Sequence, residues 1–338
     1  MRVYFLLILL CTCTIASAQT QPTSQPTTRR FIQPFGTYKL SEVRMRDVCI
    51  RPDPSTQTYY MVGPAFRGVR VYTSKDLRTW EGPRVIYQPP DDVWGDIRVQ
   101  GIWAPELHIY KGKYYLFLTF NTQHLLSEQW RNWRPRVTRG STILVSDSPT
   151  GSFKAMENHS TPPADMMTLD GTLWVEDGVP YMIFSHEWVQ IVNGAMEYVQ
   201  LKDDLSQAVS EPTLMFHASE ATWSRRGNEG GNNVTDGPYL YKSKSGKLFM
   251  IWSSFSPGGY TTGIAISDSG KLAGPWKQQD EPLYSKDGGH GMLFTTFDGK
   301  LMMVLHSPND RNARPRVFEM EDTGQTLRLI KEFTGDEQ

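Results

Sequence analysis

The chain has 338 residues, of which 39% are hydrophobic and 28 are glycine, a composition typical of a folded globular protein rather than a disordered or collagen-like one. Its 35 basic and 36 acidic residues leave a formal net charge of −1, so it has no basic excess for binding nucleic acid. The 10 tryptophans, 15 tyrosines and 15 phenylalanines supply flat amphipathic surfaces that suit an all-β core and a sugar-binding cleft.

The first 18 residues have the pattern of a signal peptide. Arg2 precedes the apolar run 3–10, and a small-residue segment that ends at Ala18 fits a cleavage site. The run is too short to span a bilayer, so we expect a protein without membrane insertion, secreted or periplasmic after cleavage near Ala18. Residues 19–30 are rich in proline and threonine and predict a flexible linker, followed by one domain over residues 31–338.

The cysteines support the same assignment of the N-terminus. Cys11 and Cys13 lie within the predicted signal peptide, which leaves Cys49 alone in the mature chain. An exported protein with one thiol forms no internal disulfide, so its stability has to come from burial of its core.

From residue 31 onward the chain repeats one pattern five times. Each repeat contains an aromatic and aliphatic run that indicates a buried strand, and a third strand follows each run. Four of the five runs follow a short turn that contains glycine, which is typical of a β-hairpin. The pattern predicts an all-β five-bladed β-propeller, since a sandwich of similar strand count would not require the same order five times. The runs are 59–62, 114–117, 181–184, 248–251 and 301–304.

Four polar residues enter the predicted innermost strands at nearly the same register. These are Asp47, Asp170, Asp236 and His290, each followed by a largely apolar strand. We therefore expect three carboxylates and a histidine to converge on the propeller axis. Converging acids shift their pKa values apart, so that a carboxylic acid and a carboxylate coexist at neutral pH, as cleavage of a glycosidic bond requires.

At these residues the chain resembles glycoside hydrolase family 43, the five-bladed propeller enzymes that cleave arabinose- and xylose-containing glycans with inversion. The resemblance covers about residues 43–320, and the order of its motifs over five blades is more specific than any one of them. The motifs include Arg46-Asp47, Trp103-Ala104-Pro105-Glu106, Asp170 before an Asp-Gly hairpin, and Gly237-Pro238.

The resemblance implies a role for each axial residue. Asp47 would be the general base, and Asp170 the acid that tunes and orients its neighbours. His290 would lie beside an axial water or calcium ion, which makes it the one candidate metal ligand; no cofactor is otherwise expected. From its place between two glycines, His290 could instead serve only to cap a tight turn.

The chain departs from the family at the proton donor. Where the family has Glu-Gly-Pro, this chain has Asp236-Gly237-Pro238. An aspartate carboxyl lies one methylene nearer its backbone, and a general acid has to come within about 3 Å of the leaving oxygen. The register favours Asp236, held protonated by apolar walls and by the charge of Asp170. The alternative donors are Glu187, Glu220 and Glu229.

Further residues near the predicted mouth are candidates for binding substrate. The tryptophans could form sugar platforms or could fill the core, and Glu106 and His108 could serve only to satisfy neighbouring donors. The candidate substrate-binding residues are Trp103, Glu106, His108, Glu187, Trp188, Trp223 and His290.

These features predict a hydrolase that releases terminal pentose units, arabinofuranose or xylose, from a plant- or algal-type polysaccharide or oligosaccharide. One alternative is a carbohydrate-binding propeller that lost catalysis through the change at Asp236. Another is a related propeller phosphorylase, which needs a basic cluster at the mouth; Arg225-Arg226 and the segment 311–316 are the candidates for it. The sequence leaves the oligomeric state open.

Overall fold

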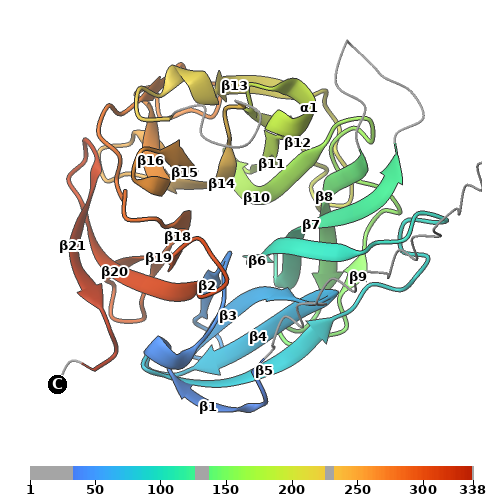
Figure 1. Ribbon diagram of the computed structural model, residues 1–338, viewed down its shortest axis with the longest axis horizontal. Helices are drawn as coiled ribbons and strands as arrows, with labels where there is room; N and C mark the ends of the chain where they lie inside the picture. Colours follow the sequence, from blue (N-terminus) through green and yellow to red (C-terminus); the bar gives the residue numbers. More distant parts are fainter. Residues whose placement is uncertain (1–32, 126–136, 225–231, 337–338) are drawn as a thin grey trace, which may run out of the picture. The chain divides into compact units, whose positions relative to one another are not determined.

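The structure is a computed structural model that describes residues 33–125, 137–224 and 232–336. Five antiparallel sheets surround a central axis and form a five-bladed β-propeller, which confirms the predicted fold (Figure 1). We number the blades I to V in chain order. Blade I contains β1 (Gly36–Lys39), β2 (Cys49–Asp53), β3 (Thr58–Ala65), β4 (Gly68–Ser74) and β5 (Thr79–Tyr87), and blade II contains β6 (Gly101–Tyr110), β7 (Lys113–Leu125), β8 (Val137–Ser146) and β9 (Lys154–Ala155).

The other three blades have four strands each, hydrogen-bonded in sequence order. Blade III contains β10 (Thr168–Glu176), β11 (Val179–His186), β12 (Ala195–Gln200) and β13 (Thr213–His217). Blade IV contains β14 (Asp236–Lys242), β15 (Leu248–Ser256), β16 (Gly259–Ser267) and β17 (Trp276–Gln278). Blade V contains β18 (Gly289–Thr295), β19 (Leu301–Ser307), β20 (Arg314–Asp322) and β21 (Leu327–Phe333).

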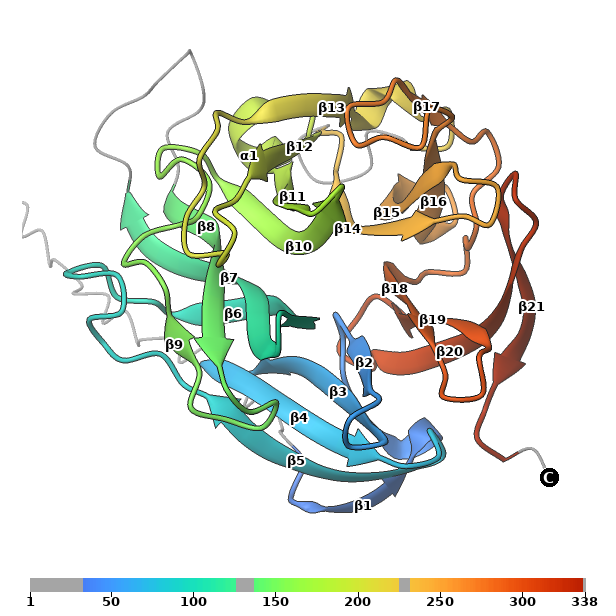
Figure 2. The same ribbon diagram turned by 180° about the vertical axis from the view of Figure 1, so that it is seen from behind.

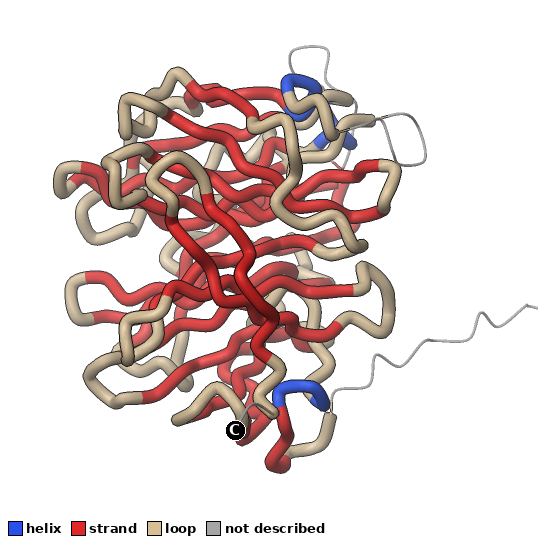
Figure 3. The backbone as a smooth tube through the Cα atoms, turned by 90° about the vertical axis from the view of Figure 1, so that its left-hand side faces the viewer, coloured by secondary structure: helices blue, strands red, loops and turns tan. Residues whose placement is uncertain are grey.

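The chain runs outward through each blade from an inner strand beside the axis. The inner strands are β2, β6, β10, β14 and β18, and Figure 1 shows them around the centre. Figure 2 shows the opposite face, with β13 and β21 at the circumference. Seen from the side in Figure 3, strands fill the body of the propeller and loops gather at its two faces, where side chains from different blades can meet.

The predicted hairpin turns lie between the first and second strands of the blades. Gly178 joins β10 to β11 with a φ of 82°, and Gly246 precedes β15 with a φ of 85°. Backbone at such angles is costly for residues that carry a Cβ, which explains the glycine in these turns. The repeated turn chemistry is therefore a direct consequence of the hairpin geometry.

Apolar side chains fill the space between neighbouring blades. Trp80 and Trp252 are completely buried, as are many of the aromatic and aliphatic side chains of the second strands. The indole of Trp80 donates to the carbonyl oxygen of Leu77 at 2.9 Å, and that of Trp276 donates to Leu272 at 2.8 Å. Trp80 and Trp276 are therefore packing residues within their blades.

Helical segments are short in the described part of the chain. They are α1 (Trp188–Ile191) and the 3₁₀ turns η1 (Leu40–Glu42) and η2 (Ala218–Glu220). Within the described residues, none of the helices has the length and apolar character needed to cross a membrane. The predicted signal peptide 1–18 and linker 19–30 lie outside the described residues, and so does the pair Arg225-Arg226.

Candidate active site

One position in each inner strand forms a ring around the axis. The strand pairing aligns Cys49, Glu106, Thr172, Tyr239 and Met292, because each pairs with the corresponding residue of its second strand. The residue two places earlier has a positive φ of 42–57° in every blade. Strained backbone repeated at one position is typical of a functional site. We call these five residues the axial ring: Asp47, Ala104, Asp170, Gly237 and His290.

Asp236 does not belong to this ring. It lies one residue before Gly237, at the position that Arg46 and Trp103 occupy in blades I and II. The sequence therefore predicted the convergence of the acids correctly but placed Asp236 one residue out of register. Its carboxylate reaches His290 from this position, and the absence of a side chain at Gly237 leaves the space that the His290 ring occupies.

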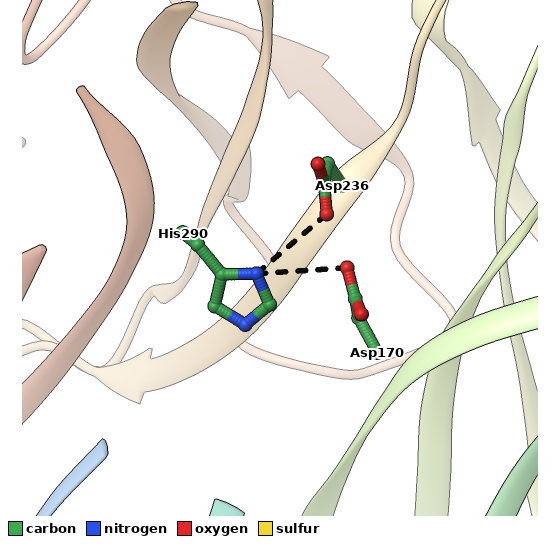
Figure 4. A group of neighbouring side chains, drawn as sticks. All are labelled: Asp170, Asp236 and His290. Atoms are coloured by element: carbon green, nitrogen blue, oxygen red, sulfur yellow. Dashed lines mark ion pairs between the residues drawn. The ribbon is translucent and has the colours of Figure 1, made fainter. Parts of the chain in front are cut away.

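His290 lies at the centre of the three carboxylates. Its Nδ1 is 3.6 Å from Asp170 Oδ2, 3.6 Å from Asp236 Oδ1 and 3.9 Å from Asp47 Oδ1. Figure 4 shows Asp170 and Asp236 directed at the same ring nitrogen. Burial disfavours the imidazolium, but the three carboxylates outweigh it and raise the pKa of His290 to about 10. A cation at this position offsets the repulsion between the acids.

Asp170 and Asp236 form a coupled pair with opposite pKa shifts. Burial and the neighbouring Asp236 carboxylate raise the pKa of Asp170 well above its ordinary value. Burial acts in the same direction on Asp236, but hydrogen bonds from Asp170, His290 and Tyr260 outweigh it and lower the pKa. The two carboxyls therefore titrate as a pair, and the directions of the shifts favour a shared proton on Asp170 over one on Asp236. These directions run against the expectation that Asp236 is held protonated.

Asp47 is the ionised carboxylate on the other side of the ring. Burial raises its pKa, yet electrostatic interactions with Arg46, His306 and His290 outweigh burial and hold the pKa below its ordinary value. The Arg46 guanidinium lies 3.3 Å from Asp47 Oδ2. The backbone N–H of Asp47 donates to His306 Nδ1 at 3.2 Å, while His306 Nε2 lies 3.1 Å from Asn309 Oδ1. His306 therefore donates through Nε2 and accepts through Nδ1.

The exposed fraction of the side chain divides the three acids and His290 into two pairs. The side chains of Asp47 and Asp236 remain 16% and 22% exposed, whereas those of Asp170 and His290 are 5% and 2% exposed. Asp47 and Asp236 can therefore meet a substrate, while Asp170 and His290 act on it through them. One ionised carboxylate and one carboxylate that shares a proton are the two groups that general acid–base cleavage needs.

A second cluster lies beside the ring on blades II and III. The Arg139 guanidinium stacks 4.3 Å from the centre of the Trp103 ring and donates to both carboxylate oxygens of Glu187. Its Nε also donates to Asn121 Oδ1 at 2.8 Å. Burial raises the pKa of Glu187 and the nearby Asp236 carboxylate adds to the rise, although Arg139 opposes it. Two expected substrate-binding residues, Trp103 and Glu187, thus share one wall.

Glu106 and His108 lie further along the axis than the ring. Both are buried, and Glu106 Oε2 lies 2.9 Å from His108 Nε2 and accepts from the Thr172 hydroxyl at 2.6 Å. These contacts satisfy neighbouring donors, which is the structural role that the sequence left open for them.

The remaining candidates lie in different surroundings. Trp188 is half-buried at the start of α1, directly after Glu187. Trp223 is only 7% exposed and packs on Trp252 at 4.8 Å between ring centroids, so it fills the core rather than forming a sugar platform. Glu220 is exposed and caps η2 by accepting from the His217 backbone N–H, and Glu229 lies outside the described residues.

Several site residues had no signal in the sequence analysis. Tyr260 donates its hydroxyl to Asp236 Oδ2 at 2.5 Å, and His306 contacts Asp47. Asn309 contacts both His306 and Arg46. Arg46 appeared only as part of a motif and Arg139 did not appear at all. These residues come from β8, the start of β16, the end of β19 and the loops of other blades, so only the closed propeller brings them to the axis.

A five-bladed propeller with three carboxylates and a histidine on its axis has the architecture of a propeller glycoside hydrolase. A family model described as "Glycosyl hydrolases family 43" matches residues 43–329, so the chain belongs to this family. This confirms the resemblance on which the assignment of roles was based.

Individual relatives agree with the family. The solved structure of an endo-arabinase from Bacteroides thetaiotaomicron VPI-5482 superposes with a TM-score of 0.75 at 36% identity, covering 88% of this chain and 98% of that one. Alpha-L-arabinofuranosidase B of Pyricularia oryzae is 24% identical, over 65% of this chain and 46% of that protein. Beta-xylosidase of Bacillus subtilis is 22% identical, over 69% of this chain and 41% of that protein. The chain thus spans about half the length of these curated relatives.

Proposed function

We propose that this glycoside hydrolase is an exported enzyme that releases terminal pentose units, arabinofuranose or xylose, with inversion. The observation that carries the proposal is the group of three carboxylates around His290, in which ionised Asp47 faces the coupled pair Asp170 and Asp236. The names of its relatives, which include an endo-arabinase, an arabinofuranosidase and a xylosidase, support a pentose substrate.

The proposed reaction is a single displacement. Asp47 accepts a proton from a water molecule as that water forms a bond to the anomeric carbon. The glycosidic C–O bond breaks at the same time, and the leaving oxygen takes a proton from Asp236. Asp170 supplies that proton to Asp236, since the two carboxyls share it, and is left ionised until the site is protonated again. His290 stabilises the negative charge that stays on the pair.

His290 could also hold the calcium ion that the family resemblance implies. Its Nε2 is buried and has no hydrogen-bond partner among the described residues, while its Nδ1 faces carboxylates. Metal-ligating histidines commonly donate their second ring N–H to a carboxylate, so the environment fits a metal ligand. Calcium prefers six to eight oxygen ligands, so most of its other ligands here would be water. A bound cation would keep the imidazole neutral, with its proton on Nδ1.

Removal of metal tests this part of the proposal. If calcium binds at His290, we expect treatment with a chelator to lower the melting temperature and added calcium to restore it. A His290→Gln variant should lose this calcium response. If the melting temperature of the wild-type protein does not respond to chelator or to calcium, His290 serves only as the cation of the ring.

The stereochemistry of the first product tests the mechanism. Proton NMR of the sugar released from a nitrophenyl pentoside should show the inverted anomer. A retained anomer would overturn the roles assigned to Asp47 and Asp236. The same panel of pentosides, assayed with and without phosphate, separates a hydrolase from a phosphorylase, and binding without turnover would indicate a carbohydrate-binding propeller.

The identity of the proton donor needs a separate comparison. Asp236→Ala should hardly cleave glycans, whose leaving groups need a proton, but should keep much more activity on aryl glycosides with good leaving groups. Glu187→Ala should impair both kinds of substrate alike if Glu187 only holds Arg139 and Trp103 in place. The opposite pattern would make Glu187 the donor.

A further inference from the structure

Tyr260 donates a side-chain hydrogen bond to Asp236 Oδ2. Tyr260 lies near the start of β16 and is only 1% exposed. Its hydroxyl donates to Asp236 Oδ2 at 2.5 Å, whereas Asp236 Oδ1 faces His290 on the axis. The two oxygens of Asp236 therefore have different surroundings. Oδ2 accepts from the Tyr260 phenol, and Oδ1 faces the axial ring.

Three contacts hold Tyr260 in place, one through its backbone and two through its ring. Its backbone N–H donates to Asp287 Oδ1 at 3.1 Å, and its ring stacks on His306 at 5.5 Å with an interplanar angle of 21°. A Cβ at Gly289 would lie 2.5 Å from Tyr260 Cε1, so the glycine leaves the space that the ring occupies. These contacts fix the hydroxyl more tightly than a flexible side chain could.

This arrangement matters because Asp236 stands where the family has a glutamate. The aspartate side chain is one methylene shorter than that of glutamate, so its carboxylate can be directed at the leaving oxygen in fewer ways. The hydrogen bond to Oδ2 therefore determines where Oδ1 points. With Oδ2 accepting from Tyr260, a proton on Asp236 has to lie on Oδ1, the oxygen that faces the axial ring.

We propose that Tyr260 is a positioning residue for the proton donor, and that it directs the acidic proton of Asp236 to Oδ1. This inference rests on the proposed function, in which Asp236 protonates the leaving oxygen.

The kinetics of a Tyr260→Phe variant on two kinds of substrate test the proposal. Removing the hydroxyl frees Oδ2 of Asp236, so the acidic proton is no longer directed to Oδ1 and proton transfer to the leaving oxygen slows. We expect kcat on a glycan to fall about 10–100-fold, with a much smaller loss on an aryl glycoside. Tyr241→Phe is the matched control, because the Tyr241 hydroxyl donates to Asp322 at 3.2 Å outside the axial ring. Tyr241→Phe should leave both measurements unchanged.

A second substitution covers the case in which Tyr260→Phe does not fold. Fluorotyrosine at position 260 keeps the ring and its donating hydroxyl, so the ratio of kcat on a glycan to kcat on an aryl glycoside should stay at the wild-type value. A wild-type ratio in Tyr260→Phe, or a ratio lowered by fluorotyrosine, would overturn the proposal.

Asp236→Ala, assayed beside these variants, separates this proposal from the proposed function. If Asp236→Ala is much less impaired on aryl glycosides and Tyr260→Phe behaves as wild type, only the positioning role fails. If Asp236→Ala is equally impaired on both substrates, Asp236 is not the donor and the inference falls with it.

Discussion

At the scale of single residues, the axial ring depends on backbone that most side chains avoid. Asp47, Asp170 and His290 have φ values of 50°, 57° and 53°. Aspartate, asparagine and histidine tolerate this left-handed region better than most residues, so polar function and backbone geometry select the same residue types here. A substitution in the axial ring therefore has to keep the polar function and also tolerate a positive φ.

Asp47→Asn separates the two requirements at the general base. Asparagine also tolerates a positive φ, so the fold should survive, but the amide cannot accept the proton from water. We expect kcat to fall by about 10²–10⁴-fold with little change in melting temperature. Asp53→Asn, at the far end of β2, the strand that follows Asp47, is the control and should keep its turnover per folded molecule. Near-normal activity of Asp47→Asn would remove Asp47 from the mechanism.

Gly237→Ala tests the crowding of the ring. An added Cβ would lie 2.9 Å from both Cα and Cγ of His290, and the φ of Gly237 is 50°. We expect a loss of about 1–3 kcal/mol in the free energy of unfolding, measured by denaturant titration, because both strain and overlap oppose the side chain. Gly246→Ala has a φ of 85° but nothing within 4 Å, so it should lose about 1 kcal/mol or less. Equal losses would show that crowding at the ring is unimportant.

At the scale of elements, some tryptophans near the inner strands lie in the core and others lie at the mouth of the propeller. Trp103 follows directly on the start of β6 and meets Arg139, whereas Trp223 precedes β14 and packs against blade IV. Trp103 is the third residue of β6, and Trp223 lies in the connection that leads to β14. Whether each ring is buried or lines the site depends on the packing of the neighbouring blade. The local sequence pattern does not indicate that packing.

Trp223→Ala tests its assignment to the core. Removing a ring that is 7% exposed and stacked on Trp252 should cost about 3–5 kcal/mol in the free energy of unfolding. Trp188→Ala removes a half-buried ring beside the site, so it should cost about 1 kcal/mol or less and should instead raise KM if Trp188 contacts sugar. Chemical denaturation and steady-state kinetics measure the two effects. A Trp223 variant of wild-type stability with a raised KM would return this residue to the substrate-binding group.

At the scale of the whole molecule, stability comes from apolar contacts between and within five closed blades, with no disulfide among the described residues. Cys49, the cysteine of the described part, is a buried free thiol, and burial raises its pKa to about 12. A thiol with so high a pKa is almost entirely protonated at neutral pH and therefore unreactive.

This predicts indifference to redox conditions. The melting temperature of the mature protein should be the same with and without dithiothreitol, and Cys49 should react with a thiol reagent only after unfolding. N-terminal sequencing of the exported protein should begin near Gln19, as we propose for a cleaved signal peptide. A start at Met1, or a melting temperature that falls under reduction, would contradict the proposed export and processing.

The sequence by itself determined the fold, because a repeated strand and turn pattern encodes each blade locally. It also identified Asp47, Asp170, Asp236 and His290, since each enters an inner strand at nearly the same register. Only the tertiary structure decided the protonation pattern and the neighbours of these acids. Tyr260 reaches Asp236 from another strand of blade IV, and His306 reaches Asp47 from blade V. Such contacts join residues far apart in the chain, and pKa values depend on distances and burial that exist only once the five blades have closed around one axis.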